Sequence, residues 1–359
     1  MDNTLIIVFG LTIRLPRVRV TGLIAMADHR SPKHLSRLDD RLIDVADGEI
    51  LCFVGLRNEA ALLPRLLDHY RNLGVDRFFF LDNGSTDGTR ELILEQPDCH
   101  CFHTEGSHFA ENVDPPRWVN TLLNVFGTGH WCVSVDADEL LVYPDFERVD
   151  LHRLCDYLDA TGSEAVIGSM IDMYADGPLA ECSYDGKIPL IEASPYFDPE
   201  PGWLRARDGL YPPQQMFGGV RERVFWRGRF KHTLPPCLTK VPIVRWRRGR
   251  HYHVAQHTIS EVRLSELRVA LLHFKFVWGF RHKSASSLSE NATLKEKGLE
   301  ERVAFMEGLE RNPKLSLRDH RSVRYRSAAQ LVDLGWMRAS DRYAEFVANA
   351  VGPRQGTAT

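Results

Sequence analysis

The chain has 359 residues, enough for one large α/β domain or two smaller ones with a buried core. Apolar residues make up 43% of the sequence and charged residues 26%, which is ordinary for a globular protein. The 45 Lys and Arg residues nearly balance the 48 Asp and Glu residues, so bulk charge gives no reason to expect nucleic-acid binding.

Residues 1 to 46 show little periodic pattern and are interpreted as a loosely ordered N-terminal extension. Their apolar stretch, residues 4 to 11, is too short to span a bilayer, and arginines follow it where a signal peptide would carry them in front. Seven cysteines without a CxxC pair indicate reduced thiols. We therefore predict a cytoplasmic protein without an integral membrane span, and peripheral docking on the inner membrane stays open.

The first strand and helix are expected between residues 50 and 74. Residues 50 to 54 are apolar and predict a strand, and Arg57, Asn58 and Glu59 form its polar end. Apolar residues then recur at helical spacing up to residue 73, and Gly74 stands where a helix C-cap belongs.

A second strand is predicted at residues 77 to 81, and it ends in Asp82. Residues 83 to 88 predict a tight turn, in which Ser85 or Thr86 caps a helix that begins near Thr89. Strand, helix and strand form a βαβ unit, which is parallel and right-handed. The polar ends of both strands should therefore meet at the carboxyl edge of the sheet, where open α/β sheets bind ligands.

Three more elements are expected before residue 136. Residues 99 to 104 predict a strand, and the Pro-Pro pair at 115 and 116 predicts a helix that ends at Gly127 or Gly129. An apolar run from residue 131 to 135 predicts a further buried strand.

Three carboxylates, Asp136, Asp138 and Glu139, follow this buried strand directly. Asp136 and Asp138 are spaced to bridge one cation, and oxygen ligands of this kind suit Mg²⁺ or Mn²⁺. Two alternatives remain: a solvated acidic turn, and the two acids of a glycoside hydrolase.

The rest of the chain predicts a helix at residues 151 to 158, a strand at 164 to 174 and a long irregular insertion at 178 to 220. A helical stretch follows at residues 294 to 309, and we expect the C-terminal third to pack against the sheet.

In combination, the NE pair, the LDNGSTDGT turn, the VDADE segment and LLHFKF resemble the glycosyltransferase family 2 type of GT-A enzyme, over roughly residues 49 to 280. The resemblance implies that Asp82, with Asn83, lies beside the base and ribose of a nucleotide-sugar. It also implies that Asp136 and Asp138 hold a divalent cation on the diphosphate, with His273 as an additional ligand. Many family members read DDGS where this chain reads DNGS, so the identity of the base stays open.

Two segments are strongly basic: residues 218 to 232 and 241 to 253. From Trp203 to His253 there are 12 Lys and Arg against 2 acids. The guanidinium fork suits diphosphate, so Arg221 and Arg223 are candidate donor ligands, as is Lys275. An anionic acceptor, single-stranded nucleic acid and a solvated strand surface are the alternatives.

The catalytic base is the least determined role. An inverting transferase needs a carboxylate to accept the proton of the acceptor hydroxyl. Glu139, Asp172, Asp176 and Glu222 are all candidates, and we favour Asp176 and Glu222. The histidines at 251, 253 and 257 have spacing suggestive of zinc but no fourth ligand nearby.

The expected fold is α/β, of the GT-A (Rossmann-like) kind, with a mixed, mostly parallel sheet flanked by helices. The expected parts are residues 1 to 46, a GT-A domain at 47 to 280, a helical extension at 281 to 351 and a tail at 352 to 359. The predicted function is Mn²⁺- or Mg²⁺-dependent sugar transfer from a nucleotide-sugar such as a UDP-sugar to a glycan or other hydroxyl acceptor, and the family resemblance implies inversion. The alternatives are a nucleotidyltransferase and a catalytically silent carbohydrate- or nucleic-acid-binding protein. The predicted nucleotide-sugar-binding residues are Arg57, Asn58, Glu59, Asp82, Asn83, Asp87, Arg221, Arg223 and Lys275.

Overall fold

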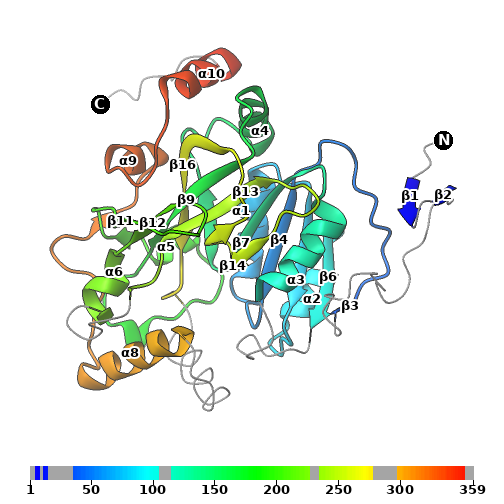
Figure 1. The fold of residues 1–359 in the computed structure, drawn as a ribbon. Helices are drawn as coiled ribbons and strands as arrows, with labels where there is room; N and C mark the ends of the chain where they lie inside the picture. Colours follow the sequence, from blue (N-terminus) through cyan, green and yellow to red (C-terminus); the bar gives the residue numbers. More distant parts are fainter. Residues whose placement is uncertain are drawn as a thin grey trace.

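A computed structural model describes residues 5–8, 11–14, 35–104, 115–226, 234–277 and 297–351. A nine-stranded sheet runs through the molecule, with helices packed around it (Figure 1). In spatial order its strands are β3 (Leu35–Arg37), β6 (Cys99–Thr104), β5 (Arg77–Asp82), β4 (Leu51–Leu56), β7 (Trp131–Asp136), β13 (Thr239–Arg245), β9 (Ala165–Asp172), β16 (Leu264–His273) and β8 (Glu139–Val142).

Strand direction confirms the predicted mixed, mostly parallel α/β fold. β4, β5, β6, β7, β9 and β16 run one way, because parallel pairs and the antiparallel pairs through β13 connect them. β3, β13 and β8 run the other way. The carboxyl ends of six strands therefore lie at one edge.

The helices confirm most of the sequence predictions. They are α1 (Leu63–Asn72), α2 (Thr89–Leu94), α3 (Pro115–Leu122), continued by a π-helical turn η1 (Leu123–Gly127), and α4 (Leu151–Ala160). Gly74 follows α1 with a φ of 95°, as a C-terminal glycine should. The predicted cap of α2 was wrong. Gly88 is its N-cap, with a φ of 90° and no side-chain hydrogen bond.

One face of the sheet packs against α1, α4 and α10 (Asp341–Val351). The fully buried rings of Tyr70, Tyr157 and Tyr343 come from these three helices. The opposite face packs against α3 and η1, where Phe79 stacks between Phe53 and Phe126 at centroid distances of 4.9 and 4.8 Å. Alternate residues of each buried strand therefore enter two separate cores.

The N-terminal part contributes more than a loose extension. Residues 35 to 37 form β3, which pairs with β6 at the edge of the sheet, and β1 (Leu5–Val8) pairs with β2 (Leu11–Arg14). The other residues before 35, and the expected tail at 352 to 359, lie outside the described residues.

The insertion at residues 178 to 220 is largely irregular, as predicted. It contains η2 (Leu179–Glu181), α5 (Leu190–Ala193), β10 (Tyr196–Phe197), the antiparallel pair β11 (Trp203–Ala206) and β12 (Gln214–Phe217), and the start of α6 (Gly219–Arg221). α6 continues into a π-helical turn, η3 (Glu222–Trp226).

The C-terminal third packs into the molecule, as expected. It comprises α8 (Lys297–Arg311), β17 (Val323–Arg324), which pairs with β10, α9 (Ala328–Asp333) and α10. Trp336 and Leu331 belong to a core formed with β8, β9 and β16. Of the helices in the described ranges, none is long and apolar enough to cross a membrane.

Replacing Phe79 with Ala should lower the free energy of unfolding by about 3–5 kcal/mol, because the stacked rings cannot collapse into the space left. Urea denaturation followed by circular dichroism measures this value. Leu94→Ala is the matched control, and since Leu94 is partly exposed at the end of α2, its cost should stay below about 1 kcal/mol. Equal losses in the two variants would contradict this account of the core.

Candidate active site

Two acids predicted from separate motifs lie on strands that flank β4. Asp82 ends β5 in register with Leu56, and Asp136 ends β7 in register with Gly55. Strands lie about 4.8 Å apart, so the Cα atoms of the two acids are on the order of 10 Å apart. The predicted convergence of these motifs at one edge is confirmed.

A turn of two residues, Ala137 and Asp138, links β7 to β8. β8 pairs with β16, where Glu139 lies opposite His273, and Asp172 of β9 lies on the other side of His273. Because β8 pairs at the far end of the sheet from β7, the β7–β8 turn brings the acids of the VDADE segment beside the ends of β9 and β16.

The side chains there form a chain of alternating charge. His273 lies between two carboxylates, with Nε2 3.3 Å from Asp138 Oδ2 and Nδ1 2.6 Å from Asp172 Oδ1. Arg221 Nε then donates to the second oxygen, Oδ2, of Asp172 at 2.8 Å. Except for Asp138, these side chains are almost completely buried.

The same chain extends to helix α8. Arg221 Nη1 donates to Glu301 Oε1 at 2.9 Å, and Lys275 Nζ donates to Glu301 Oε2 at 3.1 Å. Three predicted site residues, Arg221, His273 and Lys275, are therefore brought together, and each of them is paired with a carboxylate. Sequence reasoning missed Glu301, because nothing in its helix marks it as a partner of residues 80 and 26 positions away.

A second cation, Lys240, neutralises the other end of the VDADE segment. Its buried Nζ lies 2.7 Å from Asp136 Oδ2 and 2.5 Å from Glu139 Oε1. The backbone N–H of Asp136 donates to the other oxygen of Glu139 at 3.0 Å. Sequence reasoning also missed Lys240, although a lysine in an apolar strand is itself a sign of a buried ion pair.

The pKa values follow from these contacts. Burial alone would lower the pKa of His273, but Asp138 and Asp172 raise it to about 9. Burial would raise the pKa of Asp172, but Arg221 and His273 lower it to about 2. For Asp136, burial acts upward and Lys240 downward, and its pKa lies below the usual value. Asp136, Asp172 and His273 are thus ionised partners, whereas burial raises the pKa of Glu139.

The side chains at this edge supply only part of the ligands that a divalent cation needs. The side chain of Asp136 is half exposed and that of Asp138 is 24% exposed, so carboxylate oxygens of both can reach a ligand at the edge. Asp172 holds Nδ1 of His273, which leaves Nε2 beside Asp138 Oδ2; in the neutral imidazole Nε2 carries a lone pair, so the ligand role of His273 stays a prediction. Within the described ranges, no group of three or more His, Cys, Asp or Glu side chains is placed to hold a metal ion. A bound cation would take its remaining ligands from water and phosphate.

The predicted nucleoside residues separate into two kinds. Asp82 is fully buried, and it accepts from the backbone of Ser85 at 2.9 Å and from Arg90 at 2.6 and 2.9 Å. Asp82 therefore fixes the turn. Its side chain is not open to a ligand, in contrast to the predicted nucleoside contact. Asn83 is partly exposed and anchored by its backbone N–H to Leu56 O.

Asn58, Glu59 and Asp87 join the ends of β4 and β5. Asn58 has a φ of 57°, and its side-chain oxygen accepts from the backbone of Thr86 at 2.8 Å. The backbone of Glu59 donates to Thr89 Oγ1, and Asp87 accepts from the backbone of Ala60. Arg57 is exposed at the same edge.

Each of three other predicted residues has a side-chain partner. Arg223 donates to Asp198, at 2.8 Å from both Nε and Nη2. Asp176 is exposed and forms an ion pair with Arg318. Glu222 accepts a hydrogen bond from the indole of Trp203.

The basic segment at residues 241 to 253 lies away from the site. β13 enters the sheet near the carboxyl edge and ends at Arg245, opposite the first residue of β7. Beyond it, Arg247 and Arg250 surround the buried carboxylate of Glu164, together with Arg263. These arginines are therefore excluded as donor ligands. Residues 227 to 233 of the other basic segment lie outside the described residues.

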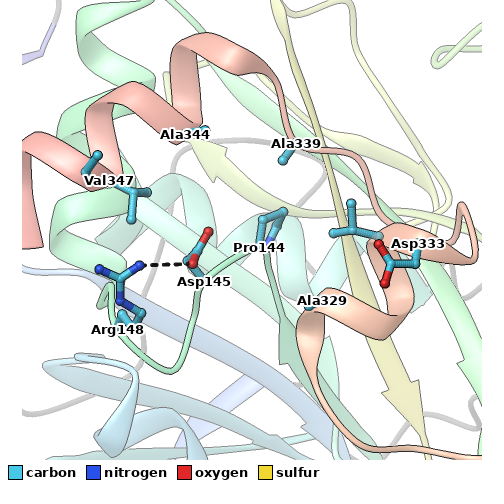
Figure 2. A pocket seen from close by; sticks show the side chains of 10 residues that line it. Pro144, Asp145, Arg148, Ala329, Asp333, Ala339, Ala344 and Val347 are labelled. Atoms are coloured by element: carbon cyan, nitrogen blue, oxygen red, sulfur yellow. Dashed lines mark hydrogen bonds and ion pairs between the residues drawn. The ribbon is translucent and has the colours of Figure 1, made fainter. Parts of the chain in front are cut away.

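A pocket of about 390 Å³ lies between the loop after β8 and helices α9 and α10 (Figure 2). Its walls are mostly small and apolar, with Asp145, Arg148 and Asp333 as charged members. None of the predicted site residues lines it, so it is separate from the carboxyl edge.

No protein-family model matches the chain, and no curated protein matches it. Similar solved structures include 4-diphosphocytidyl-2C-methyl-D-erythritol synthase, at 13% identity and a TM-score of 0.26, covering 80% of this chain and 99% of that one. UTP-bound UGPase from Acinetobacter baumannii is similar at 6% identity and a TM-score of 0.26, covering 72% and 82%. UDP-glucose pyrophosphorylase complexed with UDP-glucose is similar at 9% identity and a TM-score of 0.25, covering 84% and 98%. At these TM-scores the likenesses decide neither substrate nor reaction.

The charged His273 should make stability depend on pH. Its pKa is about 9 in the folded protein against 6.5 ordinarily, so its contribution is full below pH 6.5 and is lost as the pH rises through 9. In metal-free buffer, the difference in unfolding free energy between the protein and His273→Gln should shrink by about 3 kcal/mol from pH 6 to 10. Denaturant titrations across this range measure it. A difference independent of pH would contradict the bridging role.

Proposed function

We propose that the protein is a divalent-metal-dependent glycosyltransferase that moves a sugar from a nucleotide-sugar to a hydroxyl acceptor. The single observation that carries this proposal is that Asp136, Asp138 and the Asn83 turn lie at the same edge of the sheet, at the ends of β7 and β5 on either side of β4. A nucleoside diphosphate is long enough to span the distance between the ends of β5 and β7, which is on the order of 10 Å. Carboxylates at its phosphate end suit a cation that also binds the diphosphate.

Each side chain has a distinct task in this proposal. Asp136 and Asp138 hold the cation, which stabilises negative charge on the leaving diphosphate when bound. Lys240 holds Asp136 in place, and His273 does the same for Asp138. Neither Lys240 nor His273 needs to touch the substrate.

The nucleoside end is assigned to Asn83 instead of Asp82. Successive residues of a strand point to opposite faces, and Asp82 is enclosed by Arg90 and Ser85. The amide of Asn83 offers both a donor and an acceptor to a base. A neutral amide there also adds no further negative charge beside the diphosphate.

Glu222 is the best-placed general base among the four candidates. Asp172 is buried between two cations with a pKa of about 2, which makes it a poor proton acceptor. Glu139 is fully buried against Lys240, and Asp176 is paired with Arg318 at the surface. Glu222 lies at the start of η3, directly after Arg221 of the ion-pair chain.

Asp138→Asn should reduce release of nucleoside diphosphate by at least about 100-fold, because a neutral amide binds the cation weakly and the leaving group loses its counter-charge. A panel of nucleotide-sugars with Mn²⁺ or Mg²⁺ measures this, and EDTA should abolish the activity of the unaltered protein. Asp68→Asn, at an exposed position of α1, is the control and should retain full activity.

The same panel tests the alternatives. Turnover of nucleoside triphosphate with a sugar phosphate, in place of nucleotide-sugar, would establish a nucleotidyltransferase. Absence of nucleotide binding in calorimetry would indicate a binding protein. Full activity of Asp138→Asn would remove the metal site from the proposal.

Asp82 and Asn83 should respond differently to substitution. Asp82→Asn should lower the unfolding free energy by about 2 kcal/mol or more, because a buried charge-assisted hydrogen bond to Arg90 is lost. Asn83→Ala should change stability by less than about 0.5 kcal/mol and raise the KM for the donor about tenfold. Thermal melts and donor titrations separate the two effects. A raised donor KM in Asp82→Asn alone would reverse the assignment.

A further inference from the structure

The β11–β12 hairpin presents an aromatic side chain to solvent next to the candidate site. Every residue of β11 is exposed, and Trp203 and Leu204 retain 43% and 50% of their accessible surface. A large exposed aromatic residue on a short strand has no role in a core and is typical of a binding surface.

Trp203 is held firmly although it is exposed. Its ring stacks on Phe217 at a centroid distance of 5.2 Å, and its Nε1 donates to Glu222 Oε2 at 3.0 Å. The hairpin is closely packed at its base, because a Cβ on Gly202 would lie 2.0 Å from the carbonyl oxygen of Phe217. The indole is therefore a fixed platform, and its exposed surface is available to a ligand.

The hairpin is anchored directly to the site. Met216 of β12 bonds to the two residues before Lys240: its carbonyl accepts from Leu238 at 2.8 Å, and its N–H donates to Thr239 Oγ1 at 2.7 Å. Lys240 then binds Asp136. In Figure 1 β11 and β12 lie in the same part of the molecule as α6, whose Arg221 is bonded to Asp172.

The position of the hairpin separates it from the proposed nucleoside end. In the sheet, β5 with Asn83 at its end lies two strands from β7 on one side, and β13, which anchors the hairpin, lies next to β7 on the other. Asp136 stands between them at the end of β7. A donor whose base lies at Asn83 and whose diphosphate lies at Asp136 leaves the hairpin side for the acceptor.

The chemistry of this surface matches a sugar ring. The C–H groups on one face of a pyranose carry partial positive charge and pack on the negative face of an indole. The hydroxyl groups at the ring edge need polar partners, and Glu222 and Arg205 supply them. Arg205 is exposed two positions from Trp203 and so shares its face of β11. An apolar protein segment would bury both charges without partners.

We infer that Trp203, Arg205 and Glu222 form an acceptor subsite for a saccharide, so that the acceptor is a carbohydrate whose terminal ring stacks on Trp203. This inference deepens the proposed glycosyltransferase function and rests on it, because only a transferase would use the bound saccharide as an acceptor. The binding of a sugar ring to the hairpin is testable without turnover.

The first test measures binding alone. A panel of soluble neutral and acidic oligosaccharides is titrated into the full chain, without donor, by saturation-transfer NMR and calorimetry. Trp203→Ala should weaken binding of the recognised saccharide about tenfold, and Trp203→Phe should retain most of the affinity because a ring remains. Leu204→Ala is the control, because it removes a neighbouring exposed apolar side chain from the other face of β11.

The second test measures turnover. Trp203→Ala should raise the KM for the saccharide acceptor about tenfold while the KM for the donor stays within about twofold of the unaltered protein. Donor hydrolysis retained by a protein that binds no saccharide of the panel would overturn the subsite and leave the proposed function standing. Saccharide binding that depends on Trp203 without any turnover would sustain the subsite and count against the glycosyltransferase. Equal binding by Trp203→Ala and Leu204→Ala would overturn the inference.

Discussion

The site depends on a chain of ion pairs that makes it possible to gather acids at one edge of a sheet. β7, β9 and their connections bring Asp136, Asp138, Glu139 and Asp172 within reach of a few cations. Like charges at such distances in a buried setting would raise each other's pKa and leave some acids neutral. Lys240, His273 and Arg221 oppose this by placing a positive charge between successive carboxylates. The pKa values of Asp136 and Asp172 therefore lie below the usual value, whereas burial raises the pKa of Glu139.

The same chain couples distant parts of the protein to the edge. Glu301 of α8 is the shared counter-charge of Arg221 on α6 and of Lys275 just beyond β16. Loss of one member of a buried pair leaves the partner uncompensated, at a cost of about 3–5 kcal/mol. The C-terminal helix is thus part of the electrostatic structure of the site, and the boundary expected near residue 280 does not separate it from the function of the sheet.

Local pattern and distant pairing were not equally predictable. Periodicity gave α1, β5, β7 and α4 nearly to the residue, because apolar spacing along a segment records which face is buried. It also placed Asp82 and Asp136 at one edge, since parallel strands end together. Periodicity could not predict the ion pairs of Lys240 and Glu301, because the partners Asp136 and Arg221 lie about 100 and 80 residues away in the sequence. The contacts of His273 were not predictable for the same reason: its neighbours in the strand do not reveal that Asp172 lies at one nitrogen and Asp138 at the other.

Alternation along β5 explains why the two neighbouring residues of the turn motif carry different roles. Asp82 continues the face of Phe78 and Phe80, which is buried under the helices, so its charge must be met by Arg90 and the backbone of the turn. Asn83 follows where the strand ends and reaches the open edge instead. An acid at position 82 therefore shapes the loop, and in the proposed function the side chain at position 83 is the one assigned to the nucleotide. β7 separates this end from the β11–β12 hairpin, so Asp136 and Asp138 lie between them. In the proposed function, this order places the donor on one side of the two carboxylates and the acceptor on the other.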